Sequence, residues 1–288
     1  MIGWVDTVVQ GILLGGLYAL FAMGLSLSFG VMRLVNIAHG DLIVLAAYLA
    51  LVTVNATGLG PLAALLICVP VMFAFGYALQ RGLLNFTLGG DILPPLLVTF
   101  GLSIIIQNGL LQTFSADPRS LRLGGLETAS FHLGADIAVG YLPMLVLTVA
   151  IVLTGVLEAL FALSPWGRAF RATSDDPETV KLVGVNDRHV YALAMGLALA
   201  IVSVAAVFYG VRTTFGPSDG PDRLLFAFES VIIGGLGSFW GTLAGGIVLG
   251  VAQATGFRID PGWGVLTGHL AFLAVLLLKP SGLFPRTR

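Results

Sequence analysis

The sequence predicts an all-α, polytopic membrane protein, a transmembrane helix bundle built from about eight hydrophobic segments. Hydrophobic residues make up 57% of its 288 positions and charged residues only 10%, whereas an ordinary soluble domain has about 25% charged residues. The charges are also segregated, so that long runs contain no Asp, Glu, Lys or Arg. A soluble fold cannot bury this much apolar surface, and we therefore expect a chain that crosses the bilayer several times.

The uncharged runs give the segments in chain order. They are Thr7–Met32, Leu42–Gln80, Ile92–Ala116, Ile137–Leu157, Val190–Val211, Ser230–Phe257 and Pro261–Leu278. About 20 helical residues span the hydrocarbon core, so every run except the second has roughly the length of one span. The second is about twice as long, and the turn signal Asn55-Ala-Thr-Gly-Leu-Gly-Pro61 near its middle divides it into two. The runs are apolar at odd and even positions alike, which argues against a β-barrel.

Several function classes are disfavoured by what the sequence lacks. A formal net charge of −1 gives no electrostatic basis for binding nucleic acid. The single cysteine, Cys68, can form neither an internal disulfide nor a cysteine-based metal cage. The chain has no His-Glu-x-x-His zinc pattern, no Gly-x-Ser-x-Gly nucleophile motif and no Walker A loop. We predict no catalytic residue, no metal site and no bound cofactor, so any step driven by ATP must occur on another chain.

Charge places two regions on the cytoplasmic side, but the number of spans between them conflicts with this. Ser164–Arg188 is rich in basic residues, and the tail carries Lys279, Arg286 and Arg288 without an acid. Three hydrophobic segments separate the two regions, so three full crossings would put them on opposite sides. The stretch Gly234-Gly-Leu-Gly-Ser-Phe-Trp-Gly241 interrupts the seventh segment with glycines. A broken or re-entrant helix there would remove the conflict and would lie beside a wet pathway; a continuous helix with a close-packed glycine face is the alternative.

A short helix is predicted inside the polar segment 164–188. Asp176 is a candidate N-cap, Pro177 suits the first helical position, and Gly184 suits the residue just after the helix. Its apolar residues, which include Leu182 and Val183, need a partner surface. That surface is either a cytoplasmic protein or the membrane itself.

A polar joint follows the first span. Asn36, His39 and Asp41 lie between two apolar runs with almost no room for a loop. A break of this kind can present a helix N-terminus to a charged solute. The alternative is an interfacial turn in which Asn36 or Asp41 caps the next helix and Arg33 extends to the headgroups.

Other polar residues lie within or near the ends of apolar runs. Ionisable groups in hydrocarbon commonly mark a pathway, although Glu158 and Glu229 are close to segment ends and could reach the headgroups instead. Gln107 and Asn108 would make hydrogen bonds between helices. Glycines four residues apart, as at Gly11 and Gly15 or at Gly246 and Gly250, allow helices to pack closely.

Four stretches occur in series along the chain and together resemble one family. They are Gly16-Leu-Tyr-Ala-Leu20 through Ser28-Phe-Gly30 to Val35-Asn-Ile-Ala-His-Gly-Asp41; Gly167-Arg-Ala-Phe-Arg-Ala172 with Leu182-Val-Gly-Val185; Val231-Ile-Ile-Gly-Gly-Leu-Gly-Ser238 with Gly241, Gly245 and Gly246; and Lys279-Pro-Ser-Gly-Leu-Phe284. The set resembles the LivH-type permease of branched-chain amino acid ABC importers. Each motif is loose, but the series covers both ends and the middle of the chain.

The resemblance implies a multi-pass subunit of the bacterial inner membrane, forming a single permease domain over residues 1–288 with a coupling segment at about 164–188. Its implied partners are a second, LivM-like permease, two cytoplasmic ABC ATPases that use ATP and Mg, and a periplasmic or lipid-anchored solute-binding protein. The residues implied in coupling to the ATPases are Gly167, Arg168, Arg171, Ala172, Leu182 and Gly184. Those implied near the translocation pathway are Asn36, His39, Gly40, Gly234, Gly235 and Gly237, and either Asp41 or Glu229 could accept the ammonium group of an amino acid.

Two alternatives share parts of this interpretation. Permeases similar to this chain also serve urea and short amides, which would need no ammonium acceptor. A secondary transporter driven by protons or sodium would instead use Glu158, Glu229 and His269 as coupling groups, whereas an ATP-driven permease needs no such relay.

Overall fold

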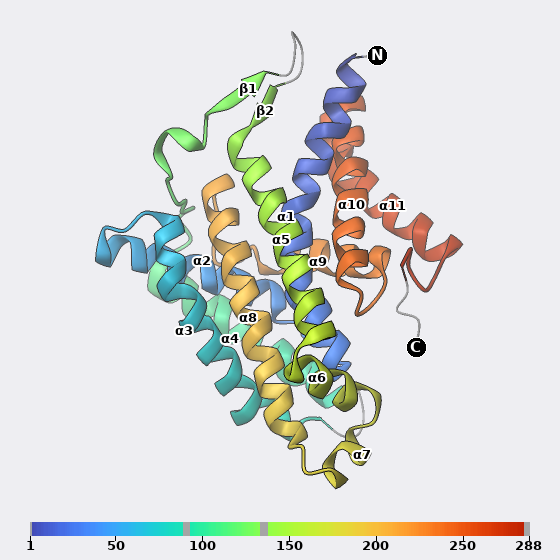
Figure 1. Ribbon diagram of the computed structural model, residues 1–288. Helices are drawn as coiled ribbons and strands as arrows, with labels where there is room; N and C mark the ends of the chain where they lie inside the picture. Colours follow the sequence, from blue (N-terminus) through green and yellow to red (C-terminus); the bar gives the residue numbers. More distant parts are fainter. Residues whose placement is uncertain (1, 89–92, 133–137, 285–288) are drawn as a thin grey trace.

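The computed structural model describes residues 2–88, 93–132 and 138–284, and Figure 1 shows the chain as a helical bundle. Eight helical segments of this part of the chain are long and apolar enough to cross a membrane, which confirms the predicted fold class. The elements in chain order are α1 (Ile2–Met32), α2 (His39–Thr57), α3 (Pro61–Gly82), η1 (Leu84–Phe86), α4 (Leu93–Phe114), η2 (Gly124–Leu126), β1 (Ser130–His132), β2 (Ala138–Gly140), α5 (Tyr141–Leu163), α6 (Pro165–Asp175), α7 (Pro177–Leu182), α8 (Asp187–Arg212), α9 (Gly220–Gly234), α10 (Phe239–Ile259), η3 (Pro261–Trp263) and α11 (Gly264–Leu278).

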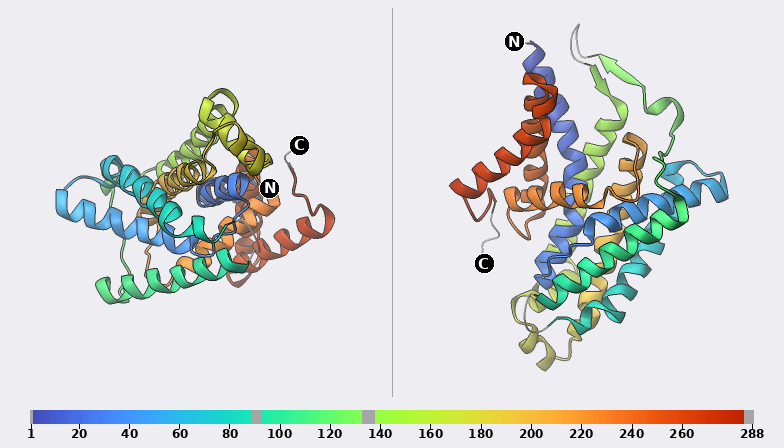
Figure 2. Two further views of the ribbon diagram at one scale, coloured as in Figure 1. Left: turned by 90° about the horizontal axis from the view of Figure 1, so that it is seen from below. Right: turned by 180° about the vertical axis from the view of Figure 1, so that it is seen from behind.

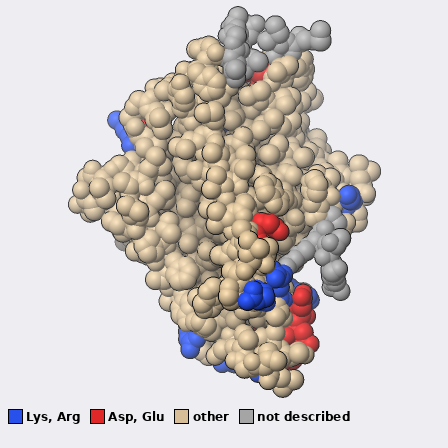
Figure 3. Space-filling view, viewed as in Figure 1, with Lys and Arg blue, Asp and Glu red and all other residues tan. Residues whose placement is uncertain are grey.

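The core lies along α1 and α8. Most residues of these two helices are buried, whereas only a minority of the residues of α3, α4, α5 and α11 are. The exposed faces are apolar, as expected of surfaces that meet lipid or another membrane subunit. The strands β1 and β2 form one antiparallel pair, with Ser130 opposite Gly140, at the end of the molecule opposite to α6 and α7 (Figure 1). Charged side chains are sparse over the middle of the surface and gather near the lower end in Figure 3.

The turn expected within the second uncharged run is present. α2 ends at Thr57, Gly58 follows with a positive φ of 69°, and Pro61 opens α3. The predicted division of this run into two spans is therefore confirmed.

Glycines bring α1 and α10 into contact. A Cβ added to Gly250 would overlap the carbonyl oxygen of Gly11, and one added to Gly15 would overlap the backbone at Ile247. The glycines four residues apart on the two helices therefore face one another, as the spacing predicts. Backbones can approach this closely only where neither helix carries a side chain.

The seventh hydrophobic segment is a broken helix. α9 ends at Gly234 and α10 begins at Phe239, and between them Gly235 and Gly237 adopt φ values of 110° and 79°, which favour glycine. Ser238 caps α10 by accepting a hydrogen bond from the N–H of Gly241 at 3.1 Å. The alternative of a continuous helix is wrong.

The break also bears on the topology. α8 and α10 both run upward in Figure 1, and α9 lies across the bundle at mid-height in both side views (Figures 1 and 2). Between the upper end of α8 and the lower end of α10 the chain passes back down through α9. After α10 it turns again, and α11 runs downward. The tail therefore turns back toward the half of the molecule that carries α6 and α7, which is the direction expected if the break removes one crossing.

The tail closes onto the break. The N–H groups of Leu283 and Phe284 donate hydrogen bonds to the carbonyl oxygens of Ile233 (2.8 Å) and Gly234 (2.9 Å). Gly282 packs against the backbone of Gly235, where a Cβ would not fit. The tail motif thus satisfies carbonyl groups at the end of α9 that have no partner within that helix.

Replacing Gly250 with valine should destabilise the bundle, because its side chain would enter the α1 backbone. Overpacking of this kind costs about 1–3 kcal/mol, so we expect a lower midpoint of thermal unfolding for the purified protein in detergent. Gly109→Ala in α4 is the control, since nothing lies within 4 Å of a Cβ added there. Equal midpoints for the two variants would contradict close α1–α10 packing.

Candidate functional site

The segment predicted to couple to an ATPase begins with a helix held firmly to the bundle. Ser164 caps α6 by accepting a hydrogen bond from the N–H of Gly167 at 2.9 Å. Gly167 lies against the end of α5 with no space for a side chain. Phe170 stacks on Phe161 with ring centroids 5.3 Å apart. α6 is therefore fixed to α5 through its buried face.

The other predicted coupling residues lie on the outer surface at the same end of the molecule. Arg168 and Ala172 are exposed, and Arg171 is partly buried. Leu182 is 86% exposed and Val183 74% exposed at the end of α7. Two such apolar side chains, displayed together on a polar segment, form a small surface suited to docking.

The end signals of α7 match the prediction. Asp176 accepts hydrogen bonds from the N–H groups of Glu178 (3.1 Å) and Thr179 (3.0 Å), and Gly184 has a φ of 82° just beyond the helix. The hydroxyl of Thr179, together with these backbone donors, holds the pKa of Asp176 below its ordinary value.

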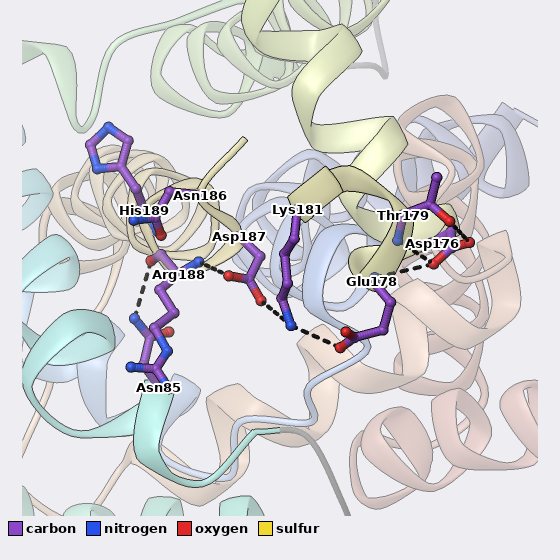
Figure 4. Close-up of polar contacts among 9 residues, drawn as sticks. All are labelled: Asn85, Asp176, Glu178, Thr179, Lys181, Asn186, Asp187, Arg188 and His189. Carbon is purple, nitrogen blue, oxygen red and sulfur yellow. Dashed lines mark hydrogen bonds and ion pairs between the residues drawn. The ribbon is translucent and has the colours of Figure 1, made fainter. Parts of the chain in front are cut away.

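Lys181 joins α7 to the start of α8. Its ammonium lies 2.8 Å from a carboxylate oxygen of Glu178 and 3.4 Å from one of Asp187 (Figure 4). The hydrogen bond with Glu178 is the main cause of a raised pKa for Lys181. These ion pairs are solvent-exposed and therefore contribute little stability. They nevertheless form a direct side-chain contact between α7 and the start of α8.

Contacts lead from this segment to the helix break. The hydroxyl of Ser174 donates a hydrogen bond to the carbonyl oxygen of Gly30 at 2.8 Å, and Arg33 donates to the carbonyl of Ser174 at 3.3 Å. A Cβ on Gly30 would lie 3.3 Å from the Cα of Gly237. The lower end of α1 thus touches both the coupling segment and the break.

A small hollow lies between α5, α6 and the break before α10. Its volume is about 160 Å³, and its lining includes Glu158, Arg171, Gly237 and Ser238. Arg171 was predicted to act in coupling and Gly237 in the pathway, and the fold brings them to one place. Glu158 is exposed here, at the end of α5.

The polar joint after the first span lies inside the protein. His39 and Asp41 are almost completely buried, and the Nε2–H of His39 donates to the carbonyl oxygen of Phe21 at 2.8 Å. Asn36 is also buried, and its side-chain oxygen accepts from the N–H of Ala38 at 3.0 Å. The residue at the N-cap of α2 is Ala38, and no side chain of the described residues caps this helix. The alternative of an interfacial turn capped by Asn36 or Asp41 is therefore wrong.

The starts of α2 and α9 meet at this joint. A Cβ on Gly40 would overlap the carbonyl oxygen of Gly220, and a Cβ on Gly220 would overlap the carboxylate of Asp41. Two helix N-termini thus approach one another inside the bundle with a carboxylate beside them, and such N-termini attract negative charge. Asp41 is accordingly placed to offset the positive ends of both helices.

Glu229 lies in the interior rather than near the headgroups. Its side chain is 2% exposed, and one carboxylate oxygen lies 2.6 Å from Nδ1 of His269. This contact ties α9 to α11. Since α9 runs from Gly220 to Gly234, it connects the two groups of predicted pathway residues, one at the start of α2 and one at the break.

Two expectations about polar side chains need correction or extension. Asn108 bonds within α4, to the carbonyl of Ile104 (2.8 Å), instead of joining helices. Gln107 donates to Ser103 of the same helix (3.1 Å), and both side chains also hydrogen-bond to the carboxylate of Asp41 in α2, so the predicted bond between helices is present for Gln107. A further bond, which was not predicted, joins α1 and α10: the hydroxyl of Tyr18 donates to the side-chain oxygen of Gln253 at 2.6 Å. A polar residue near the middle of each span was the available signal for that pair.

The cap of α7 should depend on pH. Because the pKa of Asp176 is lower in the folded protein than its ordinary value of 3.8, the cap stabilises α7 fully above that value, and this stabilisation is lost as the pH falls through the folded pKa. Hydrogen–deuterium exchange of residues 176–184, corrected for the intrinsic pH dependence, should show protection falling between about pH 5 and about pH 2.

Asp176→Asn provides the control for this experiment, since asparagine caps helices without titrating. Its protection should stay constant over the same range. An identical pH profile for the two proteins would show that the Asp176 carboxylate does not govern α7.

Comparison with known proteins places the chain in a family. A family model described as a branched-chain amino acid transport system permease component matches residues 7–277. The chain is 30% identical to BraD, a high-affinity branched-chain amino acid transport system permease protein of Pseudomonas aeruginosa, over 98% of this chain and 96% of that protein. It is 28% identical to LivH, the protein of the same description in Escherichia coli, over 96% of this chain and 94% of LivH.

The fold itself recurs in a solved structure. PsaBC from Streptococcus pneumoniae, in complex with a Fab, is similar with a TM-score of 0.52 and 14% identity, over 98% of this chain and 97% of that chain. At this level of identity the likeness concerns the fold alone. The family model that covers residues 7–277 and the 30% identity to BraD along nearly the whole chain lead to one conclusion: the chain belongs to the family of branched-chain amino acid transport system permease components.

Proposed function

We propose that this chain forms half of the translocation pathway of an ATP-driven importer for branched-chain amino acids. The observation that carries the proposal is the match of residues 7–277 to the permease family, together with relatives of almost equal length that are named for this transport. The chain lies in the inner, or plasma, membrane as a multi-pass protein. The segment 164–188 faces the cytoplasm in this proposal, so the N-terminus of α1 lies on the opposite side.

Its partners in this proposal are a second, LivM-like permease, two cytoplasmic ATPases and a solute-binding protein outside the membrane. The ATPases bind and hydrolyse ATP with Mg, and the permease itself holds no cofactor. Leu182 and Val183 at the end of α7, together with the exposed Arg168 of α6, form the docking surface. Their exposure supports this role, because apolar side chains outside the bilayer gain from burial against a protein.

Closure of the ATPase pair would act on α6 and α7 and reach the pathway through short, stiff contacts. The contact of Ser174 with Gly30, and that of Gly30 with Gly237, supports this route because neither glycine has a side chain that could yield. The break would then open or close the route beside Gly234 and Gly235. Asn36, His39, Gly40 and Asp41 lie at the other end of α9, where they would bound the same route.

Purification of the chain from its native membrane with its bound partners tests the assembly. Mass spectrometry should identify a second permease, two copies or types of ATPase and a binding protein. Thermal-shift measurements on that binding protein with leucine, isoleucine, valine and urea then test the solute. Transport by the chain alone without ATP would overturn the proposal. If urea is the only compound that stabilises the binding protein, the proposed solute is wrong and urea takes its place.

Charge placed on the docking surface should uncouple the transporter. In the assembled complex, Leu182→Glu and Arg168→Glu should each reduce both solute-stimulated ATP hydrolysis and uptake by about tenfold or more, as expected for central interface residues. Leu182→Met and Arg168→Lys are matched controls that keep the apolar or basic character and should retain activity. Unchanged midpoints of thermal unfolding are expected for all four, since both side chains are exposed. Normal hydrolysis and uptake in the two glutamate variants would exclude docking at this surface.

A further inference from the structure

A second, basic hollow lies where α3 ends and α8 begins. It has a volume of about 240 Å³ and is lined by Arg81, Asn85, Phe86, Asn186 and Arg188. The lining contains two arginines and no acid. Within the part of the chain that the structure describes, neither guanidinium has a hydrogen-bond or ion-pair partner. Two unneutralised positive charges therefore face one small space.

The acid beside Arg188 in the sequence is not part of the lining of the hollow. Asp187 precedes Arg188, but one of its carboxylate oxygens lies 3.4 Å from the ammonium of Lys181. Figure 4 shows Asp187 between Lys181 on one side and Arg188 with Asn85 on the other. Lys181 is shared by Asp187 and Glu178, so these two carboxylates stand against three cations, Lys181, Arg81 and Arg188, and the group keeps a net positive charge.

The walls of the hollow are held in place by hydrogen bonds. Asn85 donates to the carbonyl oxygen of Arg188 at 3.1 Å and accepts from the side chain of Gln80 at 2.9 Å. Both Asn85 and Gln80 are buried. The two walls come from segments about a hundred residues apart, and these bonds fix their separation before any ligand arrives.

The hollow lies at the boundary between the membrane spans and the polar segment. α3 and α8 are both membrane-spanning helices, and the hollow lies where the one ends and the other begins. Phe86 is 77% exposed at its rim. The exposed, uncharged residues Ile67, Pro70, Ala74 and Ala78, spaced three or four apart on α3, lie on the same helix face as Arg81. An apolar track ending in a cationic hollow matches the two parts of a phospholipid.

We infer that this hollow binds the phosphate headgroup of an anionic phospholipid, whose acyl chains lie along the outer face of α3. Arginine is the side chain best suited to a phosphate, because its planar guanidinium donates two hydrogen bonds at once. Basic pockets between spans on the cytoplasmic side are typical sites for such headgroups. The apolar rim favours a lipid over a free phosphate, which would leave Phe86 and the α3 track exposed.

The test is native mass spectrometry of the full-length protein with phosphatidylglycerol, and with zwitterionic phosphatidylcholine for comparison. Each arginine near an anionic headgroup contributes roughly a fivefold gain in affinity, so Arg81→Gln/Arg188→Gln should weaken phosphatidylglycerol binding about 30-fold. Phosphatidylcholine binding should not change. Arg119→Gln/Arg122→Gln, at the other end of the molecule, removes the same charge and should bind phosphatidylglycerol like the unmodified protein.

Single variants and a competition with inorganic phosphate complete the experiment. If the double variant fails to fold, the single variants Arg81→Gln and Arg188→Gln should each lose about fivefold. Equal phosphatidylglycerol binding by the variants and the unmodified protein would overturn the inference. Displacement of the lipid by inorganic phosphate would also overturn it, since the hollow would then be a site for free phosphate. None of these outcomes depends on transport activity.

Discussion

Inside a bilayer every backbone N–H and C=O must find a partner within the protein, and this requirement is hardest to meet where a helix breaks. In this chain the break lies between α9 and α10. Ser238 supplies a side-chain acceptor for the start of α10, and the tail supplies N–H donors for the last carbonyls of α9. Backbone groups on both sides of the break are thereby paired within the protein, while Gly237 and Ser238 line the hollow beside Glu158 and Arg171; non-helical backbone is tolerated at membrane depth under these conditions.

Close packing of glycines holds the helices on both sides of the break together. Lipid tails are as apolar as the helix surfaces, so helices in a membrane associate through contact and hydrogen bonding rather than through the hydrophobic effect. Gly234 lies against Gly241, Gly245 against Ser230, and Gly15 against Gly246 and Gly250. The glycines of α10 thus contact α9 on one side and α1 on the other, and a larger residue on either side would separate the break from the core.

The sequence predicted features that depend on local chemistry and missed those that depend on which helices pair. The turn before Pro61, the cap at Asp176 and the break at Gly234–Gly241 each follow from residues close together in the chain. The contact of Glu229 with His269 does not, since it joins positions 40 residues apart. Helices that are apolar on all sides have no amphipathic pattern from which a partner face can be predicted. For the same reason the sequence could not show that Asn108 bonds within its own helix, or that α2 and α9 meet end to end.

The arrangement of α9 explains why polar residues far apart in the chain can belong to one mechanical unit. Its start is held by the close contact of Gly220 with Gly40, its middle by Glu229 and His269, and its end by the tail. A short helix fixed at three points transmits a displacement along its length rather than absorbing it, because close-packed interiors deform little. The lower end of α1 touches the break through Gly30 and the coupling segment through the same residue. A force on α6 therefore has a continuous, side-chain-poor path to α9, and from α9 to the buried joint at His39 and Asp41. This physical connection gives the two groups of predicted pathway residues a reason to move together.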